Sequence, residues 1–141
     1  MRTPLEVRVE EEVDCGTYVR RRISYQSEPG NRVPAYLCIP KAALAAGAGD
    51  ATAKKFPGVL CPHPTDNIVG CGVVVGLGTR PNRAYASELA ARGFVTIAPN
   101  YPHLAGYAPN LRALGYASGS SFNVRQKPAL RGGDSRLILF A

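Results

Sequence analysis

The order of hydrophobic and polar residues in the first forty positions predicts three strands. Residues 5–13 and 18–27 alternate apolar with charged or polar side chains, which is typical of strands with one face in water. Residues 33–39 form a third run, and the turn-forming segment 28–31 (Glu-Pro-Gly-Asn) precedes it. We therefore expect an antiparallel hairpin or meander at the start of the chain.

The pattern changes in residues 56–101, which predict a strand, a loop, a helix and a second strand. Residues 58–61 and 94–98 are apolar without alternation, as in parallel strands that are covered on both faces. Pro81 and Gly93 fit the first turn and the end of the intervening helix. A helix between two such strands makes a βαβ crossover. The residues expected on its apolar face are Tyr85, Leu89 and Ala90.

The segments on either side of this unit have weaker patterns. Residues 41–55 are rich in Ala and Gly, so we expect a surface connection with a short helical turn at 42–46. Residues 120–141 have no sustained period and end in an apolar run. We interpret residues 1–119 as the structured part, the N-terminal portion of a domain, and residues 120–141 as a disordered basic tail.

Chain length, cysteine usage and the distribution of apolar residues indicate which class of protein to expect. A chain of 141 residues with 45% hydrophobic content corresponds to one domain, or one incomplete domain. Its four cysteines include no C-x-x-C pair and no accompanying histidine cluster, so we expect no metal site, and their usage suits a reducing compartment. The N-terminus lacks an apolar signal segment, and no apolar run is long enough to span a bilayer. We expect a cytoplasmic location and no membrane partner.

The net charge of +7 raises the question of nucleic-acid binding. The only basic run in the first half, residues 20–22, lies in a predicted strand close to five acidic residues between positions 6 and 14. No aromatic residues are interleaved with a basic stripe in the way that single-stranded nucleic-acid binders require. We interpret the run as a solvated, ion-paired sheet surface and expect no nucleic-acid partner.

Candidate chemistry lies after the two parallel strands. Ligand sites in open α/β sheets lie beyond the carboxyl ends of the strands, which here are residues 63–66 and 99–101. Pro64 has no N–H, so the nearest backbone donors for a developing oxyanion are Thr65 and Asp66. His63 either orients this loop through its ring or only ends the strand, and the sequence leaves both open. Asn100 and Tyr101 would lie beside it at the site mouth.

Several motifs occur together in this order: 56–65 (FPGVLCPHPT), 76–78 (Gly-Leu-Gly), 81–82, 85–86 and 89–101 (LAARGFVTIAPNY). This succession resembles the α/β-hydrolase superfamily, and within it the acetyl xylan esterase and dienelactone-hydrolase-like branch. The resemblance covers roughly residues 7–119. It implies an α/β fold in which antiparallel strands lead into a parallel βαβ unit of an incomplete sheet. By the same resemblance, Thr65 supplies an N–H of the oxyanion hole.

The nucleophile of that family is missing from the sequence. The family uses a G-x-S-x-G elbow followed by an acid and a histidine, and no G-x-S-x-G occurs here. Ser118 does not fit the motif, and neither His63 nor His103 follows a nucleophile and an acid as the general base would. We assign no catalytic residue. The expected function is a fragment of a serine-type carboxylic-ester hydrolase, inactive alone, whose intact relatives act on small esters or lactones without a cofactor. The alternative is a non-catalytic binding or interaction module on the same scaffold.

The resemblance also implies that residues 58–61 form a central strand whose neighbour would carry the serine. Without that neighbour the strand is an apolar sheet edge with unpaired peptide groups. We therefore expect self-association through this edge and through the apolar residues Leu137, Ile138, Leu139 and Phe140.

Overall fold

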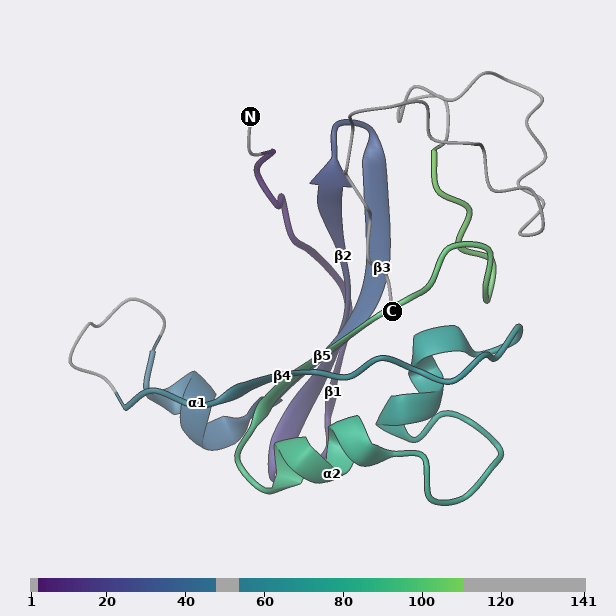
Figure 1. The fold of residues 1–141 in the computed structure, drawn as a ribbon. Helices are drawn as coiled ribbons and strands as arrows, with labels where there is room; N and C mark the ends of the chain where they lie inside the picture. Colours follow the sequence, from purple (N-terminus) through teal and green to yellow (C-terminus); the bar gives the residue numbers. More distant parts are fainter. Residues whose placement is uncertain (1–2, 48–53, 111–141) are drawn as a thin grey trace, which may run out of the picture.

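The computed structural model describes residues 3–47 and 54–110, which form a mixed five-stranded sheet with helices packed on it (Figure 1). The strand order across the sheet is β1-β2-β3-β5-β4. The elements along the chain are β1 (Arg8–Asp14), β2 (Tyr18–Glu28), β3 (Asn31–Pro40), α1 (Lys41–Ala45), β4 (Gly58–Leu60), η1 (Gly70–Val75, a 3-10 helix), α2 (Tyr85–Ala91) and β5 (Val95–Pro99).

The first three strands form the predicted antiparallel meander. β2 pairs with β1 on one side and with β3 on the other, and a tight turn at Pro29 and Gly30 joins β2 to β3. Gly30 has φ +75°, a conformation that glycine adopts without a Cβ penalty. The first strand begins at Arg8 rather than at residue 5, because the regular pairing with β2 starts there opposite Ser24. The short helical turn predicted after the meander is present as α1.

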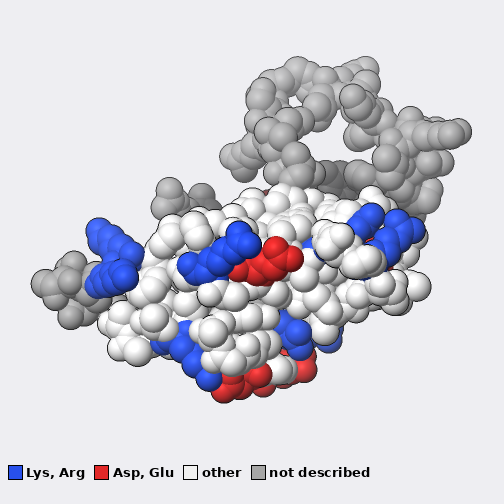
Figure 2. Space-filling view, turned by 90° about the horizontal axis from the view of Figure 1, so that it is seen from below, with Lys and Arg blue, Asp and Glu red and all other residues white. Residues whose placement is uncertain are grey.

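Basic residues of the meander are ion-paired, as predicted from the neighbouring acids. Arg21 Nε lies 2.6 Å from Glu12 Oε2, and Arg22 Nε lies 3.4 Å from Glu10 Oε2. Figure 2 shows that Lys and Arg side chains on the face seen from below are separated and have acidic side chains among them. The two ion pairs support the interpretation of residues 20–22 as a solvated sheet surface.

The predicted parallel pair is confirmed. β4 runs parallel to β5 in the register Val59 opposite Thr96, and α2 lies between the two strands in the chain. On its other side β5 is antiparallel to β3, so β4 lies at one edge of the sheet that the described strands form.

The helix differs from its prediction in start and in buried face. It begins at Tyr85 rather than near Pro81, because Asn82 has φ +61°, which interrupts a right-handed helix. Its buried residues are Ala86 and Ala90, whereas Tyr85 is exposed. The small alanine side chains let α2 approach the sheet closely enough for the Thr96 hydroxyl to donate to the Ala86 carbonyl at 3.1 Å.

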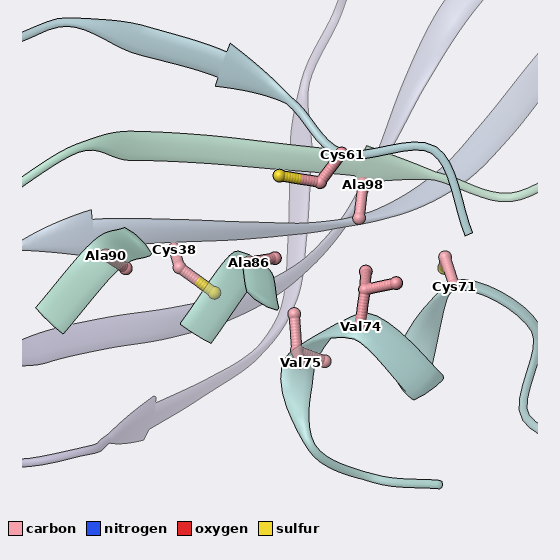
Figure 3. Close-up of a cluster of buried hydrophobic side chains, with 8 residues drawn as sticks. All are labelled: Cys38, Cys61, Cys71, Val74, Val75, Ala86, Ala90 and Ala98. Atoms are coloured by element: carbon pink, nitrogen blue, oxygen red, sulfur yellow. The ribbon is translucent and has the colours of Figure 1, made fainter. Parts of the chain in front are cut away.

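Small side chains also dominate the core between the sheet and the helices (Figure 3). The segment 70–75, which reads as part of a glycine-rich loop, is η1 and is buried throughout. It contributes Cys71, Val74 and Val75 to the same side of the sheet that α2 covers. The full cluster is Cys38, Cys61, Cys71, Val74, Val75, Ala86, Ala90 and Ala98.

The cysteines of this core are free thiols. Burial raises the pKa of Cys38 and of Cys71 to about 11, so both remain protonated at neutral pH. Both therefore pack in the core as small apolar residues.

Some predictions fall outside the described residues, namely the boundary at 119, the tail 120–141 and its apolar end. Within the described part, no helix has the length and apolar character needed to cross a bilayer. The same residues contain no cluster of three or more His, Cys, Asp or Glu side chains suited to a metal ion.

Candidate functional site

The carboxyl ends of β4 and β5 lie next to each other, and the ring of His63 joins them. His63 is only 3% exposed, and its ring stacks on that of Tyr101 with centroids 4.2 Å apart and planes 24° apart. The backbone N–H of Tyr101 donates to His63 Nε2 at 3.2 Å, and His63 Nδ1 lies 2.9 Å from the Pro64 carbonyl oxygen. A backbone N–H can only donate and a carbonyl can only accept, so the neutral tautomer with its proton on Nδ1 satisfies both bonds. His63 therefore connects the loop after β4 to the end of β5.

A second contact fixes the same loop to α2. The hydroxyl of Tyr85, the first residue of α2, donates a hydrogen bond to the carbonyl oxygen of Pro62. Burial raises the pKa of Tyr85, so the hydroxyl keeps the proton that it donates. The hydroxyl of Tyr85 thus binds the loop after β4. This contact explains why Tyr85 does not pack in the core.

Asn100 holds the loops that follow β5 and precede η1. It is 5% exposed, its Oδ1 accepts the Cys71 N–H at 3.0 Å, and its Nδ2 donates to the Leu104 carbonyl at 2.9 Å. Gly70 must lack a side chain here, because a Cβ at this position would lie 2.2 Å from Asn100 Oδ1. Gly70 also has φ +57°, which disfavours other residues. Asn100 is therefore a positioning residue whose amide oxygen and nitrogen each bind the backbone.

The two residues predicted to donate to an oxyanion lie in the loop after His63. The Asp66 carboxylate accepts the N–H groups of Val69 at 2.7 Å and of Ile68 at 2.9 Å, and these bonds hold the pKa of Asp66 below its ordinary value. Its carboxylate thus closes the turn that leads into η1. Thr65 is exposed, and within residues 54–110 the backbone N–H groups of Thr65 and Asp66 have no hydrogen-bond partner. Both N–H groups are therefore candidate donors to an anion.

A cavity of about 260 Å³ lies beside this loop system. Asn100 is part of its wall, whereas His63, Thr65, Asp66 and Tyr101 are not. Arg22 gives the cavity a cationic group that is half exposed and paired with Glu10. The lining residues are Arg22, Pro34, Ala35, Tyr36, Ile68, Val69, Cys71, Asn100 and Ala105.

The structure thus brings together His63, Asn100 and Tyr101, and it places Thr65 and Asp66 on the adjoining loop. Sequence reasoning missed Tyr85, Gly70 and Arg22 as parts of this region. Gly70 carried a signal in the run Gly70-Cys71-Gly72, since closely spaced glycines often mark close backbone contacts. The contact of Tyr85 with Pro62 joins residues 23 positions apart and has no local signal.

In the described residues, the side chain of His63 orients the backbone of the two loops. His63 uses one ring nitrogen on Tyr101 and the other on Pro64, so it is not placed to take a proton from a serine. The Oγ of Ser24 lies within 3.3 Å of Arg32, and no hydrogen bond within the described ranges joins His63 to a serine. No Ser–His–acid arrangement is present in this part of the chain.

Comparison with known proteins gives one structural similarity. Acetyl xylan esterase 1 from Thermoanaerobacterium sp. JW/SL YS485 aligns over 86% of this chain with a TM-score of 0.52 and 15% sequence identity. The chain spans 31% of the length of that structure. No family model matches the sequence, and no curated protein matches it. At this identity the similarity concerns the fold alone.

Proposed function

We propose that residues 1–119 form the N-terminal part of an α/β-hydrolase scaffold whose intact form cleaves small carboxylic esters or lactones. The main support is the position of the two loops at the adjoining carboxyl ends of parallel β4 and β5, where α/β folds bind ligands. The alignment with the acetyl xylan esterase over 86% of the chain supports the same scaffold. The ester substrate is proposed by analogy with that protein. The fold alone does not specify a substrate, because one fold hosts many reactions.

In this proposal the loop after β4 stabilises negative charge. Attack on an ester carbonyl moves charge onto its oxygen, and backbone N–H groups aimed at that oxygen lower the barrier. The N–H groups of Thr65 and Asp66 are the donors, since neither has a partner in the described part of the chain. His63 and Asn100 are positioning residues that hold this loop and the end of β5 in place, with Tyr101 at the site mouth.

The 141-residue chain alone is proposed to be inactive. Acyl transfer in this class needs a nucleophile that forms a covalent intermediate, and the sequence has no G-x-S-x-G elbow to supply one. We expect the hydrolysis of a chromogenic acetate ester to match the buffer rate. Activity above buffer that a serine-directed inhibitor abolishes would contradict this part of the proposal.

A titration with acetate tests the binding half of the proposal. Acetate is the product of acetyl-ester cleavage and presents an anionic oxygen to the donors. In an amide-resolved NMR titration we expect the resonances of Thr65 and Asp66 to shift more than that of Gly16, whose N–H already donates to Asp14 at 2.8 Å.

A matched pair of variants isolates the Thr65 donor. Thr65→Pro removes the N–H, whereas Thr65→Ser retains it, so only the first should weaken the response at Asp66. Equal shifts across the whole chain, or an unchanged response in Thr65→Pro, would contradict the assignment.

The alternative function is a non-catalytic binding module, which the cavity beside Asn100 favours. Arg22 and Tyr36 line this cavity of about 260 Å³, a volume suited to a small ligand. If acetate shifts the resonances of Val69 and Tyr36 but leaves Thr65 unchanged, the cavity rather than the loop is the binding site.

A further inference from the structure

The outer edge of β4 presents peptide groups that have no hydrogen-bond partner among residues 3–47 and 54–110. On its inner edge, the Pro57 carbonyl accepts the Val95 N–H at 2.9 Å, and the Cys61 N–H donates to the Ile97 carbonyl at 2.8 Å. Peptide groups alternate in direction along a strand, so those of Gly58 and Leu60 point away from β5. The sheet order places no described strand on that side of β4.

The side chains at this edge are apolar. Leu60 is 60% exposed, and it lies on the sheet face opposite to α2, because its neighbours Val59 and Cys61 pack toward the core on the α2 side. Sheet edges usually carry a charged residue or a bulge that discourages pairing with another chain. Residues 58–61 have neither.

Prolines limit the length of any added pairing. Pro57 and Pro62 flank the strand and lack N–H groups, so a new ladder can use only Gly58 and Leu60 as donors. An antiparallel copy centred on Val59 would place Gly58 opposite Leu60 of that copy, twice by symmetry. Each such pair exchanges both N–H to carbonyl bonds, which gives about four hydrogen bonds. Because Gly58 has no side chain, it leaves room for the facing Leu60.

The charge before the strand favours the same direction. Lys54 and Lys55 precede β4. In an antiparallel pair centred on Val59, these lysines lie opposite Pro64 and His63 of the other copy, so the lysines of the two copies are far apart. A parallel pair would place lysine beside lysine, which costs free energy at short range.

We propose that β4 of one molecule pairs antiparallel with β4 of a second copy about a two-fold axis at Val59. The occupant of the edge is thus another molecule of this chain. The contact is short, and interfaces well below about 1,200 Å² form weak complexes. The dimer is therefore weak and concentration-dependent. This inference concerns the described edge of the sheet in the 141-residue chain, whereas the proposed intact scaffold would place a further strand beside β4.

Sedimentation equilibrium of the whole chain over a wide concentration range tests the proposal. We expect a monomer–dimer equilibrium for the native sequence. Leu60→Lys keeps the backbone but places two like charges in the pairing, and we expect it to raise the dimer Kd by at least about tenfold. Val9→Lys is the matched control, since Val9 is 54% exposed on β1 at the opposite edge of the sheet. It should leave the Kd unchanged.

A cross-link tests the register. Directly opposed residues of a non-hydrogen-bonded antiparallel pair lie close enough for a disulfide. In a Cys15→Ser background, Val59→Cys should form a covalent dimer under mild oxidation, and Leu60→Lys should suppress that product. Cys38, Cys61 and Cys71 are buried and should not compete.

Three results would overturn the proposal. A monomer at all concentrations would mean that no second copy pairs with β4. The edge of β4 would then be open or covered by another segment of the same chain. A dimer lost in Val9→Lys but retained in Leu60→Lys would place the contact at β1. A dimer that yields no cross-link through Val59→Cys would exclude the antiparallel register.

Discussion

The meander of β1, β2 and β3 and the loops after β4 and β5 are held together by different kinds of hydrogen bond. In the meander, backbone groups pair with backbone groups over long strands, and ten residue pairs join β2 to β3. In the loops, single side chains hold the backbone: His63 binds Tyr101, Asn100 binds Cys71, and Asp66 binds Val69.

The difference predicts how each region responds to change. A ladder distributes its stability over many equivalent bonds, so losing one surface interaction costs little. Each loop contact is unique, and its loss leaves a backbone group without a partner. We therefore expect substitutions in the loops to cost more stability than substitutions of ion pairs on the meander.

The largest effect is expected for Gly70→Ala. The new methyl group would overlap Asn100 Oδ1, and alanine disfavours the positive φ of this position. Together these terms should lower the free energy of unfolding by about 3 kcal/mol, measured by urea denaturation. Gly106→Ala is the control, since Gly106 has φ +75° and open space around it, and it should cost only about 1–2 kcal/mol. Equal losses in the two variants would show that the Asn100 contact does not constrain Gly70.

A smaller loss is expected for His63→Phe. Phenylalanine can still stack on Tyr101, but it removes the acceptor for the Tyr101 N–H and the donor to Pro64. An unsatisfied buried group of this kind costs about 1–3 kcal/mol in urea denaturation. Tyr101→Phe preserves the ring and the backbone N–H and should change stability by less than about 0.5 kcal/mol. A neutral His63→Phe would mean that stacking alone fixes the loop.

The meander should respond weakly to Arg21→Gln. This substitution breaks the ion pair of Arg21 with Glu12, whose side chains are 29% and 52% exposed. Exposed pairs contribute about 0.2–1 kcal/mol, and molar salt should reduce the difference from the native chain. A loss as large as that of His63→Phe would contradict the proposed contrast between the two regions.

The smallest effect is expected for Asp66→Asn. The asparagine Oδ1 can still accept the N–H groups of Ile68 and Val69, so this substitution keeps the loop contact and changes only the sensitivity to acid. Hydrogen bonds from Val69 and Ile68 hold the pKa of Asp66 below its ordinary value of 3.8. A pKa that is lowered in the folded state adds stability above the unfolded-state value, and this stability is lost as the pH falls through the folded-state value. The native chain should therefore lose this contribution below about pH 3.8, as denaturation midpoints at decreasing pH would show. Asp66→Asn should have a flatter profile in that range, and an unchanged profile would refute the role of the carboxylate.

Local patterns in the sequence predicted most strands and their directions. The alternation in β2 and the uninterrupted apolar runs of β4 and β5 correctly indicated an antiparallel meander and a parallel pair. The helix between them was predicted too long, because the apolar period does not show that Asn82 adopts a positive φ, a conformation that asparagine tolerates better than most residues. The motifs in residues 56–101 also predicted an α/β fold, and the structural similarity to the acetyl xylan esterase agrees with that fold.

The contacts that build the candidate site could not be predicted from pattern. η1 is a short apolar segment that contains and precedes glycines, as a surface loop can. Val74 and Val75 are buried because of their three-dimensional packing, which the local sequence does not show. The same holds for Tyr85, whose apolar ring fits a core position in the helical period. Its hydroxyl instead binds the backbone of a loop that precedes it in the chain.

The central claim is that β4 and β5 are adjacent and parallel, so that their carboxyl ends bring His63 and Tyr101 together. Nuclear Overhauser contacts in the full chain test this directly. We predict contacts between the backbones of Val59 and Thr96 in the parallel pattern, together with contacts between the rings of His63 and Tyr101. Close Hα–Hα contacts of an antiparallel pair, or no contact between residues 58–60 and 95–97, would contradict the account.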